Sequence, residues 1–155
     1  MAEPLAVQVM KNIGEARELY HRLILMVGSV GSGKTSALQE VSAATFAPLI
    51  NVNLELSRRM LDLTERQRAL QVPRLLGEIL DETAGDVALL DNIEILFDVH
   101  LKQDPLRLLQ GLSRNKTVVA AWNGSIVDDH VTYAVPNHPE YRRYPIRDFL
   151  VASPE

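Results

Sequence analysis

The feature that most constrains this chain is a glycine-rich octapeptide between an apolar run and a helical pattern. Residues 28–35 match G-x-x-x-x-G-K-[ST] at every fixed position. The five apolar residues before it, 23–27, predict a buried strand, and residues 34–44 have the pattern of a helix. A strand, a glycine-rich turn and a helix in direct succession predict the first unit of an α/β fold.

The fixed residues of this octapeptide suit a loop that holds phosphate groups. Gly28 and Gly33 permit backbone angles and close approaches that a Cβ would block. Successive N–H groups then converge on one point, and the following helix adds its positive end. We expect Lys34 to reach the β- and γ-phosphates and Thr35 to ligate Mg²⁺. The residues predicted to contact the nucleotide are Gly28, Ser29, Val30, Gly31, Ser32, Gly33, Lys34, Thr35 and Ser36.

Further apolar runs and helical patterns alternate along the chain and predict a single domain over residues 1–155. It comprises an N-terminal helix (1–22), a nucleotide-binding core (23–124) and an irregular tail with a final strand (125–155). Strands that are apolar on both faces predict a three-layer α/β sandwich, with about five strands in a central parallel sheet. We expect strands at 48–53, 87–90, 117–122 and 149–151, and helices at 7–21, 56–62 and 104–113. A capping box should start one helix at Thr64, and Pro73 should open a separate one through Leu80.

Acidic residues follow the third predicted strand, at the edge of the sheet where ligands of such folds bind. Asp91 ends this strand, like a Walker B aspartate that contacts Mg²⁺ or its bound water. The next residue is Asn92, where many ATPases carry the glutamate that activates water. Glu94 could be that base if the chain turns sharply after Asp91, and Glu55 is a second candidate.

Asparagines and arginines supply further candidates at the strand ends. Asn123 suits a polar sensor of the γ-phosphate, although Asn-Gly is also a turn dipeptide. Asn51 or Asn53 could restrain a catalytic glutamate, or either could simply end a strand. Arg114 could be a finger on a neighbour's γ-phosphate or a cation at a helix C-terminus. Arg142 and Arg143 are alternative fingers.

Composition narrows the class of protein. The chain has no cysteine, so disulfides and thiolate sites are excluded, and its four histidines lack metal-ligand spacing. A net charge of −4 is unlike a dedicated nucleic-acid binder, and the local arginine clusters suit solvated helix faces or a nucleic-acid or partner contact. No signal peptide or membrane span is evident, which predicts a cytoplasmic protein. Trp122 is expected in the core rather than against a base.

Several stretches together resemble a known family. Residues 28–35, 89–94 and 119–124 resemble the core of an AAA-like P-loop ATPase of the additional-strand class. Residues 53–59, 64–70, 103–114 and 139–145 resemble the BrxF family, the small P-loop proteins of type 3 bacteriophage exclusion (BREX) systems. The resemblance implies a bacterial antiphage role beside large partners: a bigger ATPase, a DNA methyltransferase, a helicase and a phosphatase-like protein. AAA-type cores usually carry a C-terminal helical lid, and the proline-rich residues after Asn123 are too few for one.

Three functions follow as hypotheses from these residues. The first is an ATPase or ATP-driven switch that needs Mg²⁺ and works as a homo-oligomer or with larger partners. The second is a binding module that senses ATP without turnover, which Asn92 in place of the usual glutamate favours. The third is a small-molecule kinase, although the chain has no acceptor-site signature. ATP is expected rather than GTP, because the chain carries no signature of a guanine pocket.

Overall fold

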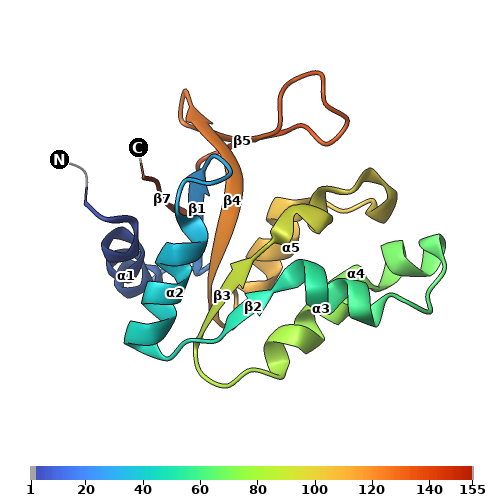
Figure 1. Cartoon of the computed structure of the whole chain (residues 1–155), viewed down its shortest axis with the longest axis horizontal. Coiled ribbons are helices and arrows are strands. Elements are labelled where there is room, and N and C mark those ends of the chain that lie inside the picture. The colour runs from blue at the N-terminus through green and yellow to red at the C-terminus, as the bar shows by residue number, and fades with distance from the viewer. Residues whose placement is uncertain (1–2, 155) are drawn as a thin grey trace.

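In the computed structural model, which describes residues 3–154, helices and strands alternate over most of the chain (Figure 1). The elements, in order, are α1 (Leu5–Ala16), β1 (Leu23–Gly28), α2 (Lys34–Thr45), β2 (Leu49–Asn51), α3 (Val52–Arg59), α4 (Glu65–Asp81), β3 (Val87–Asp91), η1 (Ile93–Phe97), η2 (Val99–Leu101), α5 (Pro105–Leu112), β4 (Thr117–Val127), β5 (His130–Tyr133), β6 (Arg142–Pro145) and β7 (Leu150–Ala152). The predicted strands at 23–27, 48–53, 87–90 and 117–122 are all present, with shifts at several boundaries, and helices lie between them.

A parallel sheet forms the centre of the molecule. Its strand order is β2-β3-β4-β1-β7, and every neighbouring pair in that order is parallel. Gly28 lies opposite Asn123 across β1 and β4, and Asn51 lies opposite Asp91 across β2 and β3. The carboxyl ends of the strands therefore meet at one edge of the sheet, as the prediction of a central parallel sheet requires.

Helices cover both faces of this sheet. Leu23, Leu25 and Val27 point into a core shared with α3, α4 and α5, whereas Ile24 and Met26 point into a second core with α1 and α2. Figure 1 shows α1 and α2 on one side of the strands and α3 to α5 on the other. Burial on both faces explains why β1 has no polar alternation, because no side chain of that strand reaches water.

Helix ends follow the capping chemistry in the sequence. Thr64 accepts from the Gln67 amide while the Gln67 side chain accepts from the Thr64 amide, so the predicted capping box is confirmed. Asp104 caps α5 ahead of Pro105, also as predicted. The first helix is shorter than expected, ending at Ala16, and Met10 on its predicted apolar side is 38% exposed.

The prediction that Pro73 opens a separate helix is wrong. One helix, α4, runs from Glu65 to Asp81 with Pro73 inside it. A proline there cannot donate to the carbonyl four residues earlier, which belongs to Ala69. That carbonyl accepts instead from Gln103 Nε2 at 2.7 Å, which leaves the helix intact.

The predicted second strand is also too long. β2 ends at Asn51, and Asn53 belongs to α3 rather than to a strand end. The cause is the Asn51 side chain, which caps α3 by accepting from the Leu54 amide at 3.0 Å. Asn51 and Asn53 are therefore engaged in starting a helix.

The fourth strand does not turn at Asn123-Gly124. β4 continues to Val127, and a two-residue loop of Asp128 and Asp129 leads into β5. Both aspartates have a left-handed backbone, with φ angles of 51° and 58°. A Cβ on Gly124 would lie 1.8 Å from the Thr132 carbonyl, so the glycine permits the close approach of β5.

The tail is more regular than predicted. β5 and β6 continue from β4 as an antiparallel ribbon, and only β7, near the expected final strand, returns to the parallel sheet. Four aromatic rings join the ribbon to the core: Phe97, Trp122, Tyr133 and Tyr144. Trp122 is fully buried among them, which confirms its place in the core. Within the described residues, no helix is long and apolar enough to cross a membrane.

Candidate functional site

A cleft of about 380 Å³ opens at the carboxyl edge of the sheet, between the glycine-rich loop (residues 28–35) and the end of β3. It gathers residues from three separate parts of the sequence. The residues that line it are Val30, Gly31, Gly33, Lys34, Thr35, Ser36, Asp91, Asn92, Glu94 and Asn123. A slightly larger hollow of about 420 Å³ lies between α4 and α5, but it is formed by two helix faces and lacks this convergence.

The glycine-rich loop has the backbone that a phosphate cradle needs. Gly31 and Gly33 have positive φ angles of 80° and 92°, which other residues adopt only with strain. A Cβ on Gly28 would lie 2.6 Å from Ser32 Oγ, so the loop is closed too tightly there for a side chain without rearrangement. Gly33 is also the N-terminal cap of α2, which directs the positive end of that helix into the cleft.

Lys34 is buried beneath this loop. It is 6% exposed, and its Nζ donates to the carbonyls of Gly28 at 2.8 Å and Ser29 at 2.6 Å. Burial lowers the pKa of the Lys34 ammonium, and the carboxylates of Glu94 and Asp91 act in the opposite direction. The Lys34 ammonium has lost most of its water to burial. A phosphate bound in the cleft would supply the negative charge and the hydrogen-bond acceptors that this water provided.

Thr35 and Asp91 come together from different elements. Thr35 Oγ1, in the first turn of α2, donates to Asp91 Oδ2 at 2.8 Å at the end of β3. Within residues 3–154, no group of three or more histidine, aspartate or glutamate side chains could hold a metal ion. A hydroxyl beside one carboxylate does fit Mg²⁺, which usually takes one or two protein carboxylates and completes its shell with substrate phosphates and water.

Glu94 reaches the cleft because the chain reverses directly after Asp91. Asn92 has a left-handed backbone (φ 54°, ψ 52°), and the short helix η1 begins at the next residue. Asn123 Nδ2 then donates a short hydrogen bond to Glu94 Oε1. The sharp turn after Asp91 that would bring Glu94 to the site is therefore present. Asn123 lines the cleft and lies within β4 rather than in a turn.

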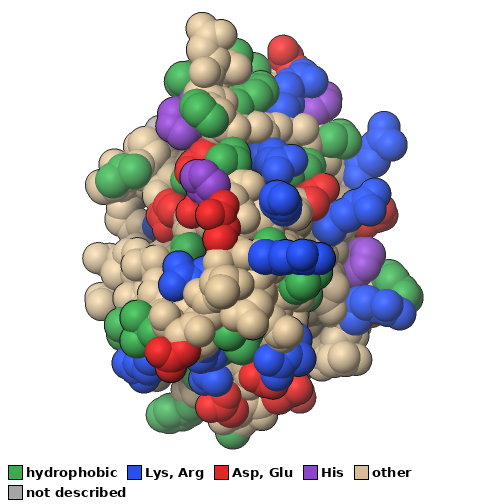
Figure 2. All heavy atoms as spheres, turned by 90° about the vertical axis from the view of Figure 1, so that its right-hand side faces the viewer, with side chains coloured by type: hydrophobic (Ala, Val, Ile, Leu, Met, Phe, Trp, Pro, Cys, Tyr) green, Lys and Arg blue, Asp and Glu red, His purple; other side chains and the backbone are tan. Residues whose placement is uncertain are grey.

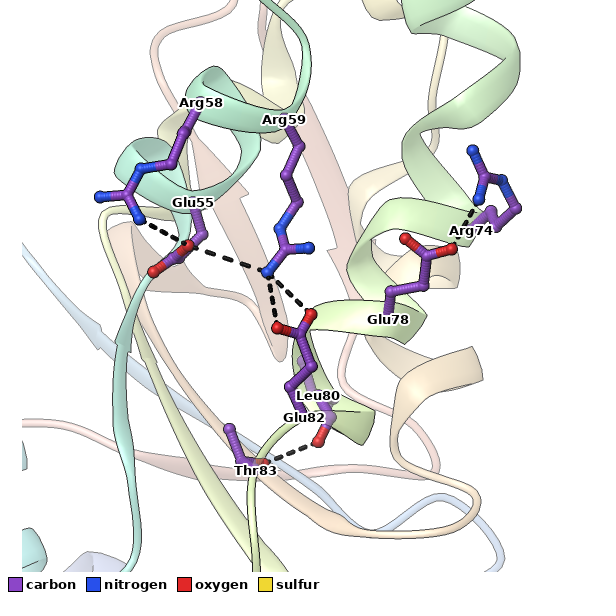
Figure 3. Close-up of polar contacts among 8 residues, drawn as sticks. All are labelled: Glu55, Arg58, Arg59, Arg74, Glu78, Leu80, Glu82 and Thr83. Atoms are coloured by element: carbon purple, nitrogen blue, oxygen red, sulfur yellow. Dashed lines mark hydrogen bonds and ion pairs between the residues drawn. The ribbon is translucent and has the colours of Figure 1, made fainter.

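Glu55, the other candidate base, does not line the cleft. Its carboxylate lies 3.8 Å from Arg58 and 4.0 Å from Arg59 on the same helix. Arg59 also pairs with Glu82 at 2.8 Å, so these side chains form one network at the surface of α3 and α4 (Figure 3). Of the two candidate carboxylates, Glu94 alone lies beside Lys34 and Asp91.

The three candidate arginines lie outside the cleft. Arg114 precedes β4 at the opposite edge of the sheet, with its guanidinium 5.1 Å from the centre of the Tyr20 ring. Arg142 donates to the Gln103 carbonyl at 2.9 Å, and Arg143 is exposed beside it on β6. None of them can act on the cleft of its own chain in this arrangement. Action on a neighbouring copy stays a prediction.

Several other basic residues lie among acidic ones. On the side of the molecule that carries α3 and α4, Lys and Arg side chains are interspersed with Asp and Glu (Figure 2). Arg74 pairs with Glu78 at 2.5 Å along α4, and Arg107 lies 3.9 Å from Asp104. Such ion pairs are typical of a solvated helix surface. They favour that interpretation of the arginine clusters over a nucleic-acid or partner contact.

Comparison with known proteins finds a weak structural likeness. No protein-family model matches the chain, and no curated protein matches it. Among solved structures it is similar to C. elegans PCH-2, an AAA+ ATPase, with 23% identity and a TM-score of 0.34. The match covers 80% of this chain but only 35% of the length of PCH-2. The α/β fold with its central parallel sheet is compatible with that of P-loop nucleoside triphosphatases.

Proposed function

We propose that this chain is an AAA-like P-loop subunit of the additional-strand class that binds Mg-ATP on residues 28–36 and hydrolyses it. One observation carries the proposal. Five polar side chains from four elements line the same cleft: Lys34 and Thr35 of α2, Asp91 of β3, Glu94 of η1 and Asn123 of β4. A solvated set of polar residues has no reason to converge at the carboxyl ends of parallel strands, whereas a ligand site has.

The side chains divide the work by chemistry. Lys34 would contact the β- and γ-phosphates, and Thr35 with Asp91 would hold Mg²⁺, which neutralises charge on those phosphates. Glu94 would accept the proton of a water whose oxygen bonds to the γ-phosphorus as the bond to the ADP oxygen breaks. Asn123, which already donates to Glu94, would fix the direction of that carboxylate.

The cleft also supports a site that needs help from a second chain. Among its lining residues, all within the described part of the sequence, Lys34 is the only cation. Mg²⁺ and one lysine would leave part of the negative charge of the triphosphate unbalanced in the transition state, and phosphoryl-transfer enzymes often add an arginine. We therefore propose activity in a homo-oligomer or with larger partners. The sequence resemblance to BrxF supports partners of BREX type 3 antiphage defence.

The test is steady-state ATP binding and hydrolysis by the wild type beside Lys34→Ala, at several protein concentrations. We expect binding and turnover that both require Lys34, with specific activity that rises as protein concentration rises. Unchanged nucleotide binding in Lys34→Ala would overturn the assignment of the loop. Lys11→Ala is the matched control, because Lys11 pairs with Glu3 on the surface of α1.

A second function, a nucleotide-gated module without turnover, is favoured by the Asn123–Glu94 hydrogen bond. This bond occupies Glu94 Oε1, so only Oε2 is left to accept a proton from water. Glu94→Gln separates the two functions, since it keeps the shape and the polar contact and removes the base. Turnover that disappears in this variant while ATP still binds supports hydrolysis. Binding without turnover in the wild type, alone and with its partners, supports the module.

A further inference from the structure

The end of β3 presents a geometric problem that the sequence alone does not solve. Side chains in a strand alternate between the two faces of the sheet. If β3 continued straight, Asp91 and Ile93 would point to one face and Glu94 to the other. The structure instead buries Ile93 to 1% exposure and places both Asp91 and Glu94 in the cleft.

Asn92 resolves this problem through its backbone. Its left-handed φ and ψ of 54° and 52° end the strand in a single residue and start η1. Asparagine adopts this conformation more readily than other residues with a Cβ, and β-branched residues adopt it least. The residue at the place of the usual glutamate is thus one that allows the chain to reverse.

Two hydrogen bonds hold the reversed chain. The Asn92 amide donates to Asp91 Oδ1 at 2.9 Å, and the Asn92 carbonyl accepts from the Asn53 amide at 3.1 Å in the first turn of α3. Ile93, Leu96 and Phe97 anchor η1 in the core beyond the turn. The turn is therefore fixed on both sides, with Glu94 carried between two anchored points.

We infer that Asn92 is a positioning residue for hydrolysis: its left-handed turn delivers Glu94, two residues beyond its usual place beside the aspartate, to the Mg-ATP cleft. This inference rests on the proposed function. It assigns no contact between Asn92 and ATP through its side chain. The left-handed backbone conformation of residue 92 positions Glu94. The side chain at this position affects hydrolysis only because it determines how easily the residue adopts that conformation.

A series at this one position tests the inference. Asn92→Gly keeps the left-handed conformation, Asn92→Ala strains it, and Asn92→Val strains it most. We expect Asn92→Gly to keep the wild-type kcat, and Asn92→Ala to lower kcat about 5- to 30-fold, the effect of left-handed strain. Asn92→Val should lower it further. The affinity for ATP, measured separately, should stay at the wild-type value in all three, because the loop of residues 28–35 is untouched.

Further measurements separate positioning from loss of structure. Melting temperatures identify any variant that fails to fold, and if Asn92→Val does, the Gly and Ala variants still decide. Hydrogen exchange at the Asn53 amide should accelerate in Asn92→Ala, because that amide donates to the strained residue. Asn53→Ala is the control, since it removes a side chain and keeps the amide.

The outcomes are distinct. Equal kcat in the wild type, Asn92→Ala and Asn92→Val would overturn the inference alone. Loss of ATP affinity in parallel with kcat would also overturn it, because it would make Asn92 a general structural residue. A wild type that binds ATP without Glu94-dependent turnover would instead overturn the proposed hydrolysis, and the inference with it.

Discussion

Thr35 and Asp91 are the two residues expected to share Mg²⁺, and their 2.8 Å hydrogen bond shows that they reach the same point. We expect Thr35→Val to raise the Mg²⁺ concentration for half-maximal ATP binding about tenfold or more, given about 1.5–3 kcal/mol for a contact to a charged group. In Thr35→Val/Asp91→Asn, chelation of Mg²⁺ should scarcely change ATP affinity. Titrating Mg²⁺ against ATP binding measures both. A double variant that still responds to Mg²⁺ like the wild type would place the metal elsewhere.

The same residues show how far single positions could be predicted. Lys34, Thr35 and Asp91 follow from motif and strand pattern, because their placement depends only on where a strand ends. The choice between Glu94 and Glu55 could not be made that way. It depends on the backbone angles of Asn92 and on arginines that engage Glu55, and both are properties of the folded chain.

At the scale of elements, α4 depends on a partner far away in sequence. Gln103 Nε2 donates to the carbonyls of Ala69 and Leu101, each at 2.7 Å. Pro73 has no N–H to donate to the Ala69 carbonyl. We expect Gln103→Ala to lower the free energy of unfolding by about 1–3 kcal/mol, because two carbonyls lose their donor. In a Pro73→Ala background the loss should be smaller, since residue 73 then donates to Ala69 itself.

A double-mutant cycle in urea measures this coupling. Additive losses, with the same effect of Gln103→Ala in both backgrounds, would show that the helix tolerates the proline without Gln103. Gln71→Ala serves as the control, because Gln71 lies on the same helix and its side chain accepts from the exposed Arg74 side chain.

Elements with a local cause were predicted, and those with a distant cause were not. The capping box at Thr64, the cap at Asp104 and the apolar strands are each determined by a few neighbouring residues. The continuity of α4 through Pro73 is decided by Gln103, and the extension of β4 beyond Asn123 by the backbone of β5 against Gly124. The β5–β6 ribbon was missed for the same reason, since its strands are short and their pairing is visible only in three dimensions.

At the scale of the whole molecule, the cluster of Phe97, Trp122, Tyr133 and Tyr144 packs the β5–β6 ribbon against the central sheet and η1. The sheet was predicted from the sequence, and the ribbon was not. Phe97 follows Glu94 in η1, and its ring stacks on Tyr133 of β5 at 3.6 Å between ring centres. Trp122, beside Asn123 in β4, donates its indole N–H to the Thr132 carbonyl at 3.0 Å. The elements that carry Glu94 and Asn123 are therefore packed on the ribbon, so the stability of the ribbon and the geometry of the cleft depend on each other.

This burial has a consequence at high pH. Burial raises the pKa of the Tyr133 hydroxyl to about 12, with Glu140 and Glu94 adding to it. In the unfolded chain a tyrosine loses its proton near pH 10. Between these values the unfolded state binds fewer protons than the folded state, so the stability that Tyr133 contributes is complete below pH 10 and is lost as the pH rises toward 12.

We therefore expect the wild type to lose about 1–3 kcal/mol more unfolding free energy than Tyr133→Phe between pH 9 and pH 12. Phenylalanine keeps the stack on Phe97 and has no group to titrate, so the difference between the two proteins reports the Tyr133 hydroxyl. Urea unfolding at several pH values gives the two curves. Parallel curves would mean that the Tyr133 hydroxyl reaches water, and that the ribbon packs less closely on the core than the cluster indicates.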